Sequence, residues 1–109
     1  MSQFDVHANP GRNRQHIPFV VVVQSSLFGS LQRRVVVPLV AAESLARHGE
    51  LPETPVTPRF TLANRQLILN PLEIVSVPCA LLGEPVASLA DQGDTIVAAL
   101  DAVFSRAWD

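Results

Sequence analysis

The stretches that decide the fold are FVVVVQ at residues 19–24 and RRVVVP at residues 33–38. Consecutive valines favour an extended backbone, because their branched side chains pack well on a pleated surface and crowd a helix. The link between the two runs is short and contains Gly29 and Ser30. We therefore predict that the two runs pair as an antiparallel hairpin.

Two further strands are predicted at the start of the chain and before the C-terminal segment. Residues 3–7 alternate between polar and apolar side chains, and the turn sequence Asn9-Pro10-Gly11 follows them. Residues 73–82 form a longer apolar run, in which Pro78 suits the edge of a sheet or a bulge because it has no N–H to donate.

A second hairpin is predicted in the middle of the chain. Residues 59–62 and 66–69 are strand-like, and they flank Ala63-Asn64-Arg65, a plausible tight turn. Before them, residues 41–47 hold good helix formers, and Gly49 suits the end of a short helix. The prolines of the stretch that follows predict an extended linker. They are Pro52, Pro55 and Pro58.

The C-terminal segment has the clearest helical periodicity. Asp91 and Asp94 lie near its start, where acidic side chains favour a helix N-terminus. One apolar stripe is expected along this helix. Its members are Ile96, Val97, Leu100, Val103, Phe104, Ala107 and Trp108. The sequence thus predicts a mainly β, β-rich α+β fold with five to seven short strands and a C-terminal α-helix, as a single domain over residues 1–109.

Composition limits the classes of partner. The formal net charge is −2 and all eight basic residues are arginine, so neutralisation of nucleic-acid phosphates is not expected to drive binding. A chain of 109 residues with 48% apolar content often buries leftover apolar area in an oligomer. The polar start lacks the apolar stretch of a signal peptide, and residues 17–23 are too short to cross a bilayer. We expect a cytoplasmic protein without membrane contact.

No residue pattern indicates catalysis, a cofactor or a metal. The single cysteine, Cys79, excludes an internal disulfide, and its apolar neighbours predict a small buried side chain. His7, His16 and His48 lie in or beside turns and have no metal-ligand spacing, so we expect all three to be exposed. We therefore expect a protein that is not an enzyme, with no catalytic residue, no cofactor and no metal.

The basic pairs and two apolar sites are the candidates for partner contacts. Arg33 and Arg34 fit either a solvated strand edge or a groove that binds an acidic peptide; Arg12 and Arg14 are the other basic pair. Leu27-Phe28 beside Gly29 predicts either an exposed contact surface or a loop folded onto the core. Trp108 either completes the helix stripe or serves as an aromatic interface anchor.

Four segments, in this order and with these separations, carry a family resemblance. They are Gln3-Phe4 with Val6; Phe19-Val20 leading to Val23-Gln24-Ser25; Arg33-Arg34 leading to Val37-Pro38-Leu39; and Val75-Ser76-Val77-Pro78 followed by Gly83-Glu84, Val86 and Leu89. Together they resemble the CcdB family of bacterial toxins, and the resemblance extends from about the first residue to Phe104.

The resemblance implies an SH3-like barrel of antiparallel strands with a smaller accessory sheet and a C-terminal helix. It also implies a homodimer paired near the C-terminal helices, which binds the DNA gyrase A subunit and traps the cleaved-DNA complex. Such a toxin belongs to a type II toxin–antitoxin module of the plasmid-maintenance kind. It acts by binding one state of its target, and a CcdA-like antitoxin neutralises it.

The resemblance also assigns site residues. Family toxins end in Trp-Gly-Ile, but this chain has Ser105-Arg106-Ala107 at the aligned positions, followed by Trp108 and Asp109. Three outcomes are open at this end of the chain: Trp108 replaces the usual gyrase anchor, together with Phe104 and Asp101; the toxin targets a different gyrase; or the gyrase function has been lost. Leu27-Phe28 matches a pair of isoleucines near the gyrase contact. The antitoxin is expected to contact the basic pairs, Arg12, Arg14, Arg33 and Arg34.

Two alternatives stay open at this stage. MazF-type endoribonucleases share the barrel, and Arg33, Arg34 and Glu73 would be the groups available for RNA cleavage if they converged. The second alternative is a CcdB homologue that has lost gyrase poisoning and only binds antitoxin.

Overall fold

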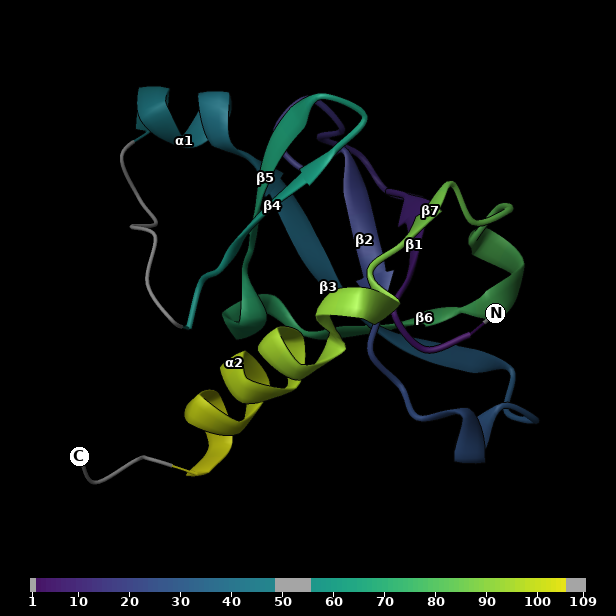
Figure 1. Ribbon diagram of the computed structural model, residues 1–109. Helices are drawn as coiled ribbons and strands as arrows, with labels where there is room; N and C mark the ends of the chain where they lie inside the picture. The colour runs from purple at the N-terminus through teal and green to yellow at the C-terminus, as the bar shows by residue number, and fades with distance from the viewer. Residues whose placement is uncertain (1, 49–55, 106–109) are drawn as a thin grey trace.

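The computed structural model describes residues 2–48 and 56–105, whose strands form one curled antiparallel sheet that closes nearly into a barrel (Figure 1). The strands are β1 (Asp5–Ala8), β2 (Phe19–Val22), β3 (Arg33–Ala41), β4 (Arg59–Leu62), β5 (Arg65–Leu69), β6 (Val75–Pro78) and β7 (Ala87–Ser88). The helices are α1 (Ala42–His48) and α2 (Gly93–Ser105), with 3-10 turns η1 (Ser26–Phe28), η2 (Pro71–Glu73), η3 (Cys79–Leu81) and η4 (Ala90–Gln92). The strand order is β4-β5-β3-β2-β1-β7, and β6 pairs with β3 outside this path. The predicted β-rich α+β fold is confirmed.

The predicted central hairpin forms, with Val21 of β2 opposite Val37 of β3. Strand β3 is longer than the run that predicted it and passes through Pro38. Its first half pairs with β6 and its last three residues pair with β5, so Pro38 lies where the neighbouring strand changes. The Pro38 carbonyl accepts from the Asn70 N–H on that side (3.1 Å). The missing N–H of Pro38 therefore falls in the gap between β6 and β5, where the ladder loses no hydrogen bond.

The second hairpin, β4–β5, forms the smaller branch of the sheet. Ala63 and Asn64 alone make its turn, with φ of 50° and 63°, the left-handed conformation of a two-residue type I′ loop. Arg65, which the sequence placed in the turn, pairs with Leu62 and begins β5. The turn is thus one residue tighter than predicted.

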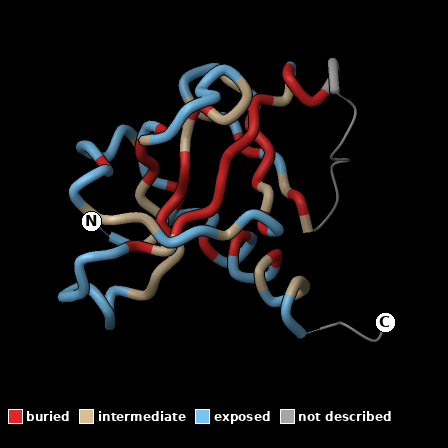
Figure 2. Tube along the Cα trace, turned by 180° about the vertical axis from the view of Figure 1, so that it is seen from behind, coloured by how far each residue is buried: buried red, intermediate tan, exposed pale blue. Residues whose placement is uncertain are grey.

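Helix α2 covers the open side of the barrel and completes the main core. Figure 2 shows buried residues running along the central strands, while the end of α2 is exposed. The buried residues of this core are Val6, Val21, Val37, Leu39, Phe60, Leu67, Leu69, Leu89, Ile96 and Ala99. No helix among the residues described is long and apolar enough to span a lipid bilayer.

Several predicted boundaries are wrong, for local reasons. The strand predicted over residues 73–82 is reduced to Val75–Pro78, because Asn70 caps η2 before it and the chain turns into η3 after Pro78. The first strand begins at Asp5 because Phe4 has a φ of 70°, and β7 was not predicted.

The helix predicted from residue 41 begins at Ala42, because Ala41 belongs to β3. Gly49, predicted to end that helix, and the linker residues Pro52 and Pro55 lie outside the described residues.

The expectation that all three histidines are exposed is wrong. His7 is 0% exposed, and its Nδ1 donates to the Gly83 carbonyl (2.8 Å), while its Nε2 is buried without a hydrogen-bond partner. His16 is half-buried and its Nδ1 bonds to the Ser44 hydroxyl. The His48 side chain lies outside what the structure describes. Cys79 is free and only half-buried, rather than fully buried.

Candidate partner-binding site

The first candidate surface is built around η1, in the loop between β2 and β3. The Ser25 hydroxyl caps η1 by accepting from the Leu27 N–H (3.2 Å). The Gln24 amide ties the loop to the sheet, because it donates to the Phe28 carbonyl (3.1 Å) and accepts from the Val35 N–H (3.0 Å). The capped turn directs Leu27 outward, 87% exposed, with Phe28 exposed beside it.

Arg34 supports this loop from below. Its side chain is only 8% exposed, and its guanidinium donates to the carbonyls of Leu31 (2.7 Å), Arg33 (2.9 Å) and Gly29 (2.9 Å). The Leu31 and Gly29 carbonyls lie outside the strands, so Arg34 satisfies them where the loop leaves the sheet.

Arg33 is exposed, in contrast to Arg34, and donates to the Ser76 hydroxyl and carbonyl on β6. Because β6 pairs with this end of β3, the expectation that the two arginines form a solvated strand edge is wrong.

We call the exposed apolar side chains of the η1 loop and of the neighbouring turn η3 the loop surface. The Leu31 N–H donates to the Phe28 carbonyl (3.1 Å), and the Cys79 N–H donates to the Gln32 carbonyl (2.8 Å), so η3 lies against the loop. The loop surface consists of Leu27, Phe28, Leu31 and Leu81, all exposed.

The second candidate surface lies on the outer side of α2. The predicted apolar stripe divides in two along this helix. Ile96 is buried, and Leu100 and Val103 are partly buried, facing the barrel. Val97, Asp101 and Phe104, which we call the helix surface, are exposed on the other side, with Phe104 70% exposed. Their spacing of four and three residues places them on one face.

A shallow hollow adjoins the helix surface. Its lining residues are Ala98, Asp101, Ala102 and Ser105. Trp108 and Ala107, the last members of the predicted stripe, lie outside the described residues. Whether Trp108 completes the stripe or projects from it therefore stays a prediction.

The two surfaces are separate on one chain. In Figure 1 η1 lies at the lower right, whereas the last turn of α2 lies at the lower left. The described residues that are expected to contact gyrase therefore lie in two separate places, with Leu27 and Phe28 on η1 and Asp101 and Phe104 on α2.

The two basic pairs are also apart. Arg12 and Arg14 are exposed in the loop that precedes β2, whereas Arg33 and Arg34 follow the loop after β2. Because β2 crosses the barrel between them, the pairs lie at opposite ends of the sheet (Figure 1).

The residues of the endoribonuclease alternative do not converge. Arg34 is occupied by loop carbonyls, and the Glu73 carboxylate accepts from the Asn70 side-chain amide (3.1 Å). The Asn70 backbone meets β3 at Pro38, five residues from Arg33, which corresponds to roughly 16 Å along an extended strand. The described residues also contain no group of three or more His, Cys, Asp or Glu side chains able to hold a metal ion.

Comparison with known proteins gives one informative match. The family model described as CcdB protein matches residues 3–105 of this chain. This range takes in every strand of the barrel and α2 to its last residue, and Trp108 lies beyond it. A search of the curated proteins finds no match.

Proposed function

Because the chain belongs to the CcdB family, we propose that it poisons DNA gyrase: it binds the gyrase A subunit and traps the enzyme on cleaved DNA. Family membership indicates a toxin of a toxin–antitoxin pair. The proposal goes further, to the target and to the residues that contact it.

The observation that carries the proposal is the exposure of large apolar side chains on well-held elements. Leu27 projects from a capped and hydrogen-bonded turn, and Phe104 projects from a helix anchored in the core. Covering such exposed side chains with a partner lowers the free energy of the complex, and buried apolar anchors dominate protein interfaces. The two patches therefore favour a binding protein whose target is another protein.

A homodimer would place the loop surfaces and the helix surfaces of two copies on one particle. We propose that two copies pair near their α2 helices, as the family resemblance implies. Pairing would bring two helix surfaces together and leave a loop surface on each side. The gyrase contacts would then be shared between Leu27 and Phe28 of the loop surface and Asp101, Phe104 and Trp108 of the C-terminal region.

Trapping of a cleaved complex requires preferential binding to that state. A ligand shifts a conformational equilibrium only by the difference between its affinities for the two states. We propose that the toxin fits the gyrase conformation that exists while the DNA is broken, and so slows resealing without catalysing any step. It would act in the cytoplasm, where the bacterial chromosome and gyrase are found.

A CcdA-like antitoxin would neutralise the toxin through its basic residues. Arg12, Arg14 and Arg33 have exposed guanidinium groups able to pair with an acidic segment. Arg34 belongs to the same candidate set, and its donors already bond to backbone carbonyls. Its part in antitoxin binding would be to hold the loop that precedes Arg33.

A gyrase cleavage assay tests the proposal. Purified protein is incubated with supercoiled DNA, ATP and gyrase from the source organism, and the reaction is denatured before electrophoresis. We expect linear DNA in proportion to the protein, and we expect Leu27→Asp and Trp108→Ala to reduce it at least about tenfold, as for the loss of an interface anchor. Val86→Asp is the matched control, because Val86 is an exposed apolar residue outside both surfaces.

Absence of linear DNA with a folded protein would contradict gyrase poisoning. If that protein still dimerised and bound an acidic antitoxin segment, it would be a homologue that only binds antitoxin. Equal loss of cleavage with Val86→Asp would contradict the assignment of the loop surface.

A further inference from the structure

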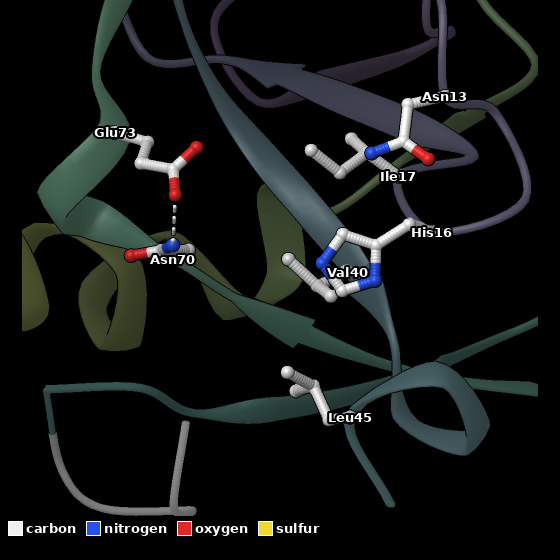
Figure 3. Close-up of a pocket in the computed structure, with 7 residues that line it drawn as sticks. All are labelled: Asn13, His16, Ile17, Val40, Leu45, Asn70 and Glu73. Atoms are coloured by element: carbon white, nitrogen blue, oxygen red, sulfur yellow. Dashed lines mark hydrogen bonds between the residues drawn. The ribbon is translucent and has the colours of Figure 1, made fainter. Parts of the chain in front are cut away.

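A pocket on the face of the sheet opposite the main core is not used by the proposed function. It has a volume of about 300 Å³ and lies between the β1–β2 loop, the first turn of α1 and η2 (Figure 3). Its lining residues are Asn13, His16, Ile17, Val40, Leu45, Asn70 and Glu73. A volume of this size is at the lower end of the range for small-ligand sites.

The floor of the pocket is aliphatic. Val40 and Leu45 are buried and pack with Ile68 in a small core cluster, against which Ile17 is partly buried. None of these floor residues is aromatic, and the one ring among the lining residues is the His16 imidazole on the rim. The floor suits an alkyl chain, because transfer of the chain from water to an apolar surface is favourable.

The polar rim is fixed in place on one side by η2. The Asn70 side-chain oxygen accepts from the Leu72 N–H (3.2 Å), and the Asn70 amide donates to Glu73 Oε1 (3.1 Å). The other oxygen of Glu73 points away from Asn70 (Figure 3). Among the residues described, no basic side chain forms an ion pair with Glu73.

The opposite side of the rim is equally well held. The Asn13 carbonyl accepts from the N–H groups of His16 (3.2 Å) and Ile17 (2.9 Å), which fixes the loop. His16 is bonded to the hydroxyl of Ser44 on α1, and the His16 carbonyl accepts from the Ala41 N–H (2.8 Å). The pocket is therefore formed before any ligand arrives.

The chemistry of the pocket selects the charge of its ligand. The Glu73 carboxylate disfavours an anion and, among the described residues, has a hydrogen bond from Asn70 but no ion pair, so a cation is favoured. A bare metal ion is disfavoured, because only His16 and Glu73 among the lining residues are of ligand type. An alkyl chain on Val40 and Leu45 that ends in a cation would satisfy the floor and the rim together.

We propose that this pocket binds an alkylammonium or alkylguanidinium group. The group would be either a free small amine or the lysine or arginine side chain of a partner protein. The proposal is independent of gyrase poisoning, because the pocket shares no residue with the loop surface or the helix surface.

Titration with n-butylguanidinium, followed by amide NMR of the full chain, tests the proposal. We expect saturable shifts at Ile17, Val40 and Leu45, with a dissociation constant on the order of 1 mM for so small a ligand. n-Butanol and pentanoate, which have the same butyl chain without a cation, should bind at least about threefold more weakly, and added salt should weaken the binding of n-butylguanidinium. Equal binding of n-butanol, or no saturable shift, would overturn the proposal.

A pair of variants identifies the carboxylate. Glu73→Gln should weaken n-butylguanidinium binding about threefold to fivefold, as expected for loss of an accessible ion pair. Glu84→Gln removes an exposed carboxylate outside the pocket and should leave the affinity unchanged. Unchanged affinity in Glu73→Gln would overturn the assignment, and if that variant does not fold, the salt dependence of the wild-type protein decides the same point.

A blocked peptide with one central arginine separates the two sources of the cation. Binding of the peptide at least as tight as that of n-butylguanidinium would identify a partner side chain as the ligand. Binding of n-butylguanidinium alone would identify a free small amine. Failure of both would overturn the proposal, and none of these outcomes affects the gyrase cleavage assay.

Discussion

The loop surface and the helix surface expose similar side chains but are held in different ways. The loop surface rests on one buried cation, Arg34, which binds carbonyls that no strand or helix satisfies. The helix surface is the outer side of a regular helix whose inner side, with Ile96, belongs to the main core. In both places the exposed residues are free to serve a partner, because other residues supply the stability.

The difference also separates local from global stability. Loss of support beneath the loop surface should loosen only residues 25–32, since the strands on both sides keep their ladders. Loss of support beneath the helix surface should destabilise the whole barrel, because α2 covers its core. Mutations beneath and on each surface test this distinction.

The largest effect is expected beneath the helix surface, for Ile96→Ala. Ile96 is fully buried, so the change removes apolar contacts and leaves a cavity, and should lower the free energy of unfolding by about 3 kcal/mol. Urea denaturation measures it. Val97→Ala, at the adjacent exposed position, is the control and should cost less than about 0.5 kcal/mol. Equal costs would show that α2 is not anchored through Ile96.

The next effect is expected beneath the loop surface, for Arg34→Met. The substitution removes the donors to three carbonyls and should cost about 2 kcal/mol. NMR amide signals should change in residues 25–32 and remain in place along α2. Arg33→Ala is the matched control and should cost less than about 1 kcal/mol, because its contacts with Ser76 are exposed. Broad changes along α2 in Arg34→Met would contradict a local role.

A smaller effect is expected where α2 begins, for Gly93→Ala. A Cβ at this position would lie 2.6 Å from Phe4 Cε2, closer than unstrained packing allows. Helix propensity favours alanine over glycine, but we expect the clash to prevail with a net cost of about 1 kcal/mol. Thermal unfolding shows whether the substitution raises or lowers the stability of the protein. A stabilised Gly93→Ala would show that the Phe4 ring moves aside without penalty.

The smallest effect on stability is expected on the surfaces themselves, for Leu27→Asp and Phe104→Asp. Both side chains are mostly exposed, so each change should alter the free energy of unfolding by less than about 0.5 kcal/mol. Urea denaturation and gyrase cleavage would be measured on the same samples. Loss of cleavage in step with loss of stability would contradict a direct binding role for these residues.

The sequence predicted the regular elements better than the irregular ones. The valine runs predict β2 and β3, and the helical spacing of apolar residues predicts α2, because both patterns reflect local preferences of the chain. Strand β7 has two residues and depends on pairing with β1, so no local pattern marks it. The division of residues 73–82 depends on the Asn70 cap and on the turn after Pro78, which an apolar pattern does not show.

The candidate site was predictable in part. Leu27-Phe28 beside Gly29 left two interpretations open, and the structure shows both side chains exposed. The burial of Arg34 was not foreseeable, since a sequence does not reveal that three carbonyls converge on one guanidinium. The burial of His7 was missed for a similar reason, because its acceptor, the Gly83 carbonyl, lies far along the chain.

Strand β3 has a consequence for the kinetics of folding. It pairs with β2 just before it in the chain and with β5 and β6 far after it, up to the match of Arg33 with Pro78. Closing such long loops costs entropy before the contacts repay it, so folding is expected to take roughly milliseconds to seconds. The edge of β3 that pairs with β5 and β6 would therefore remain unpaired until those later strands are synthesised, a period in which the nascent chain is most prone to aggregation.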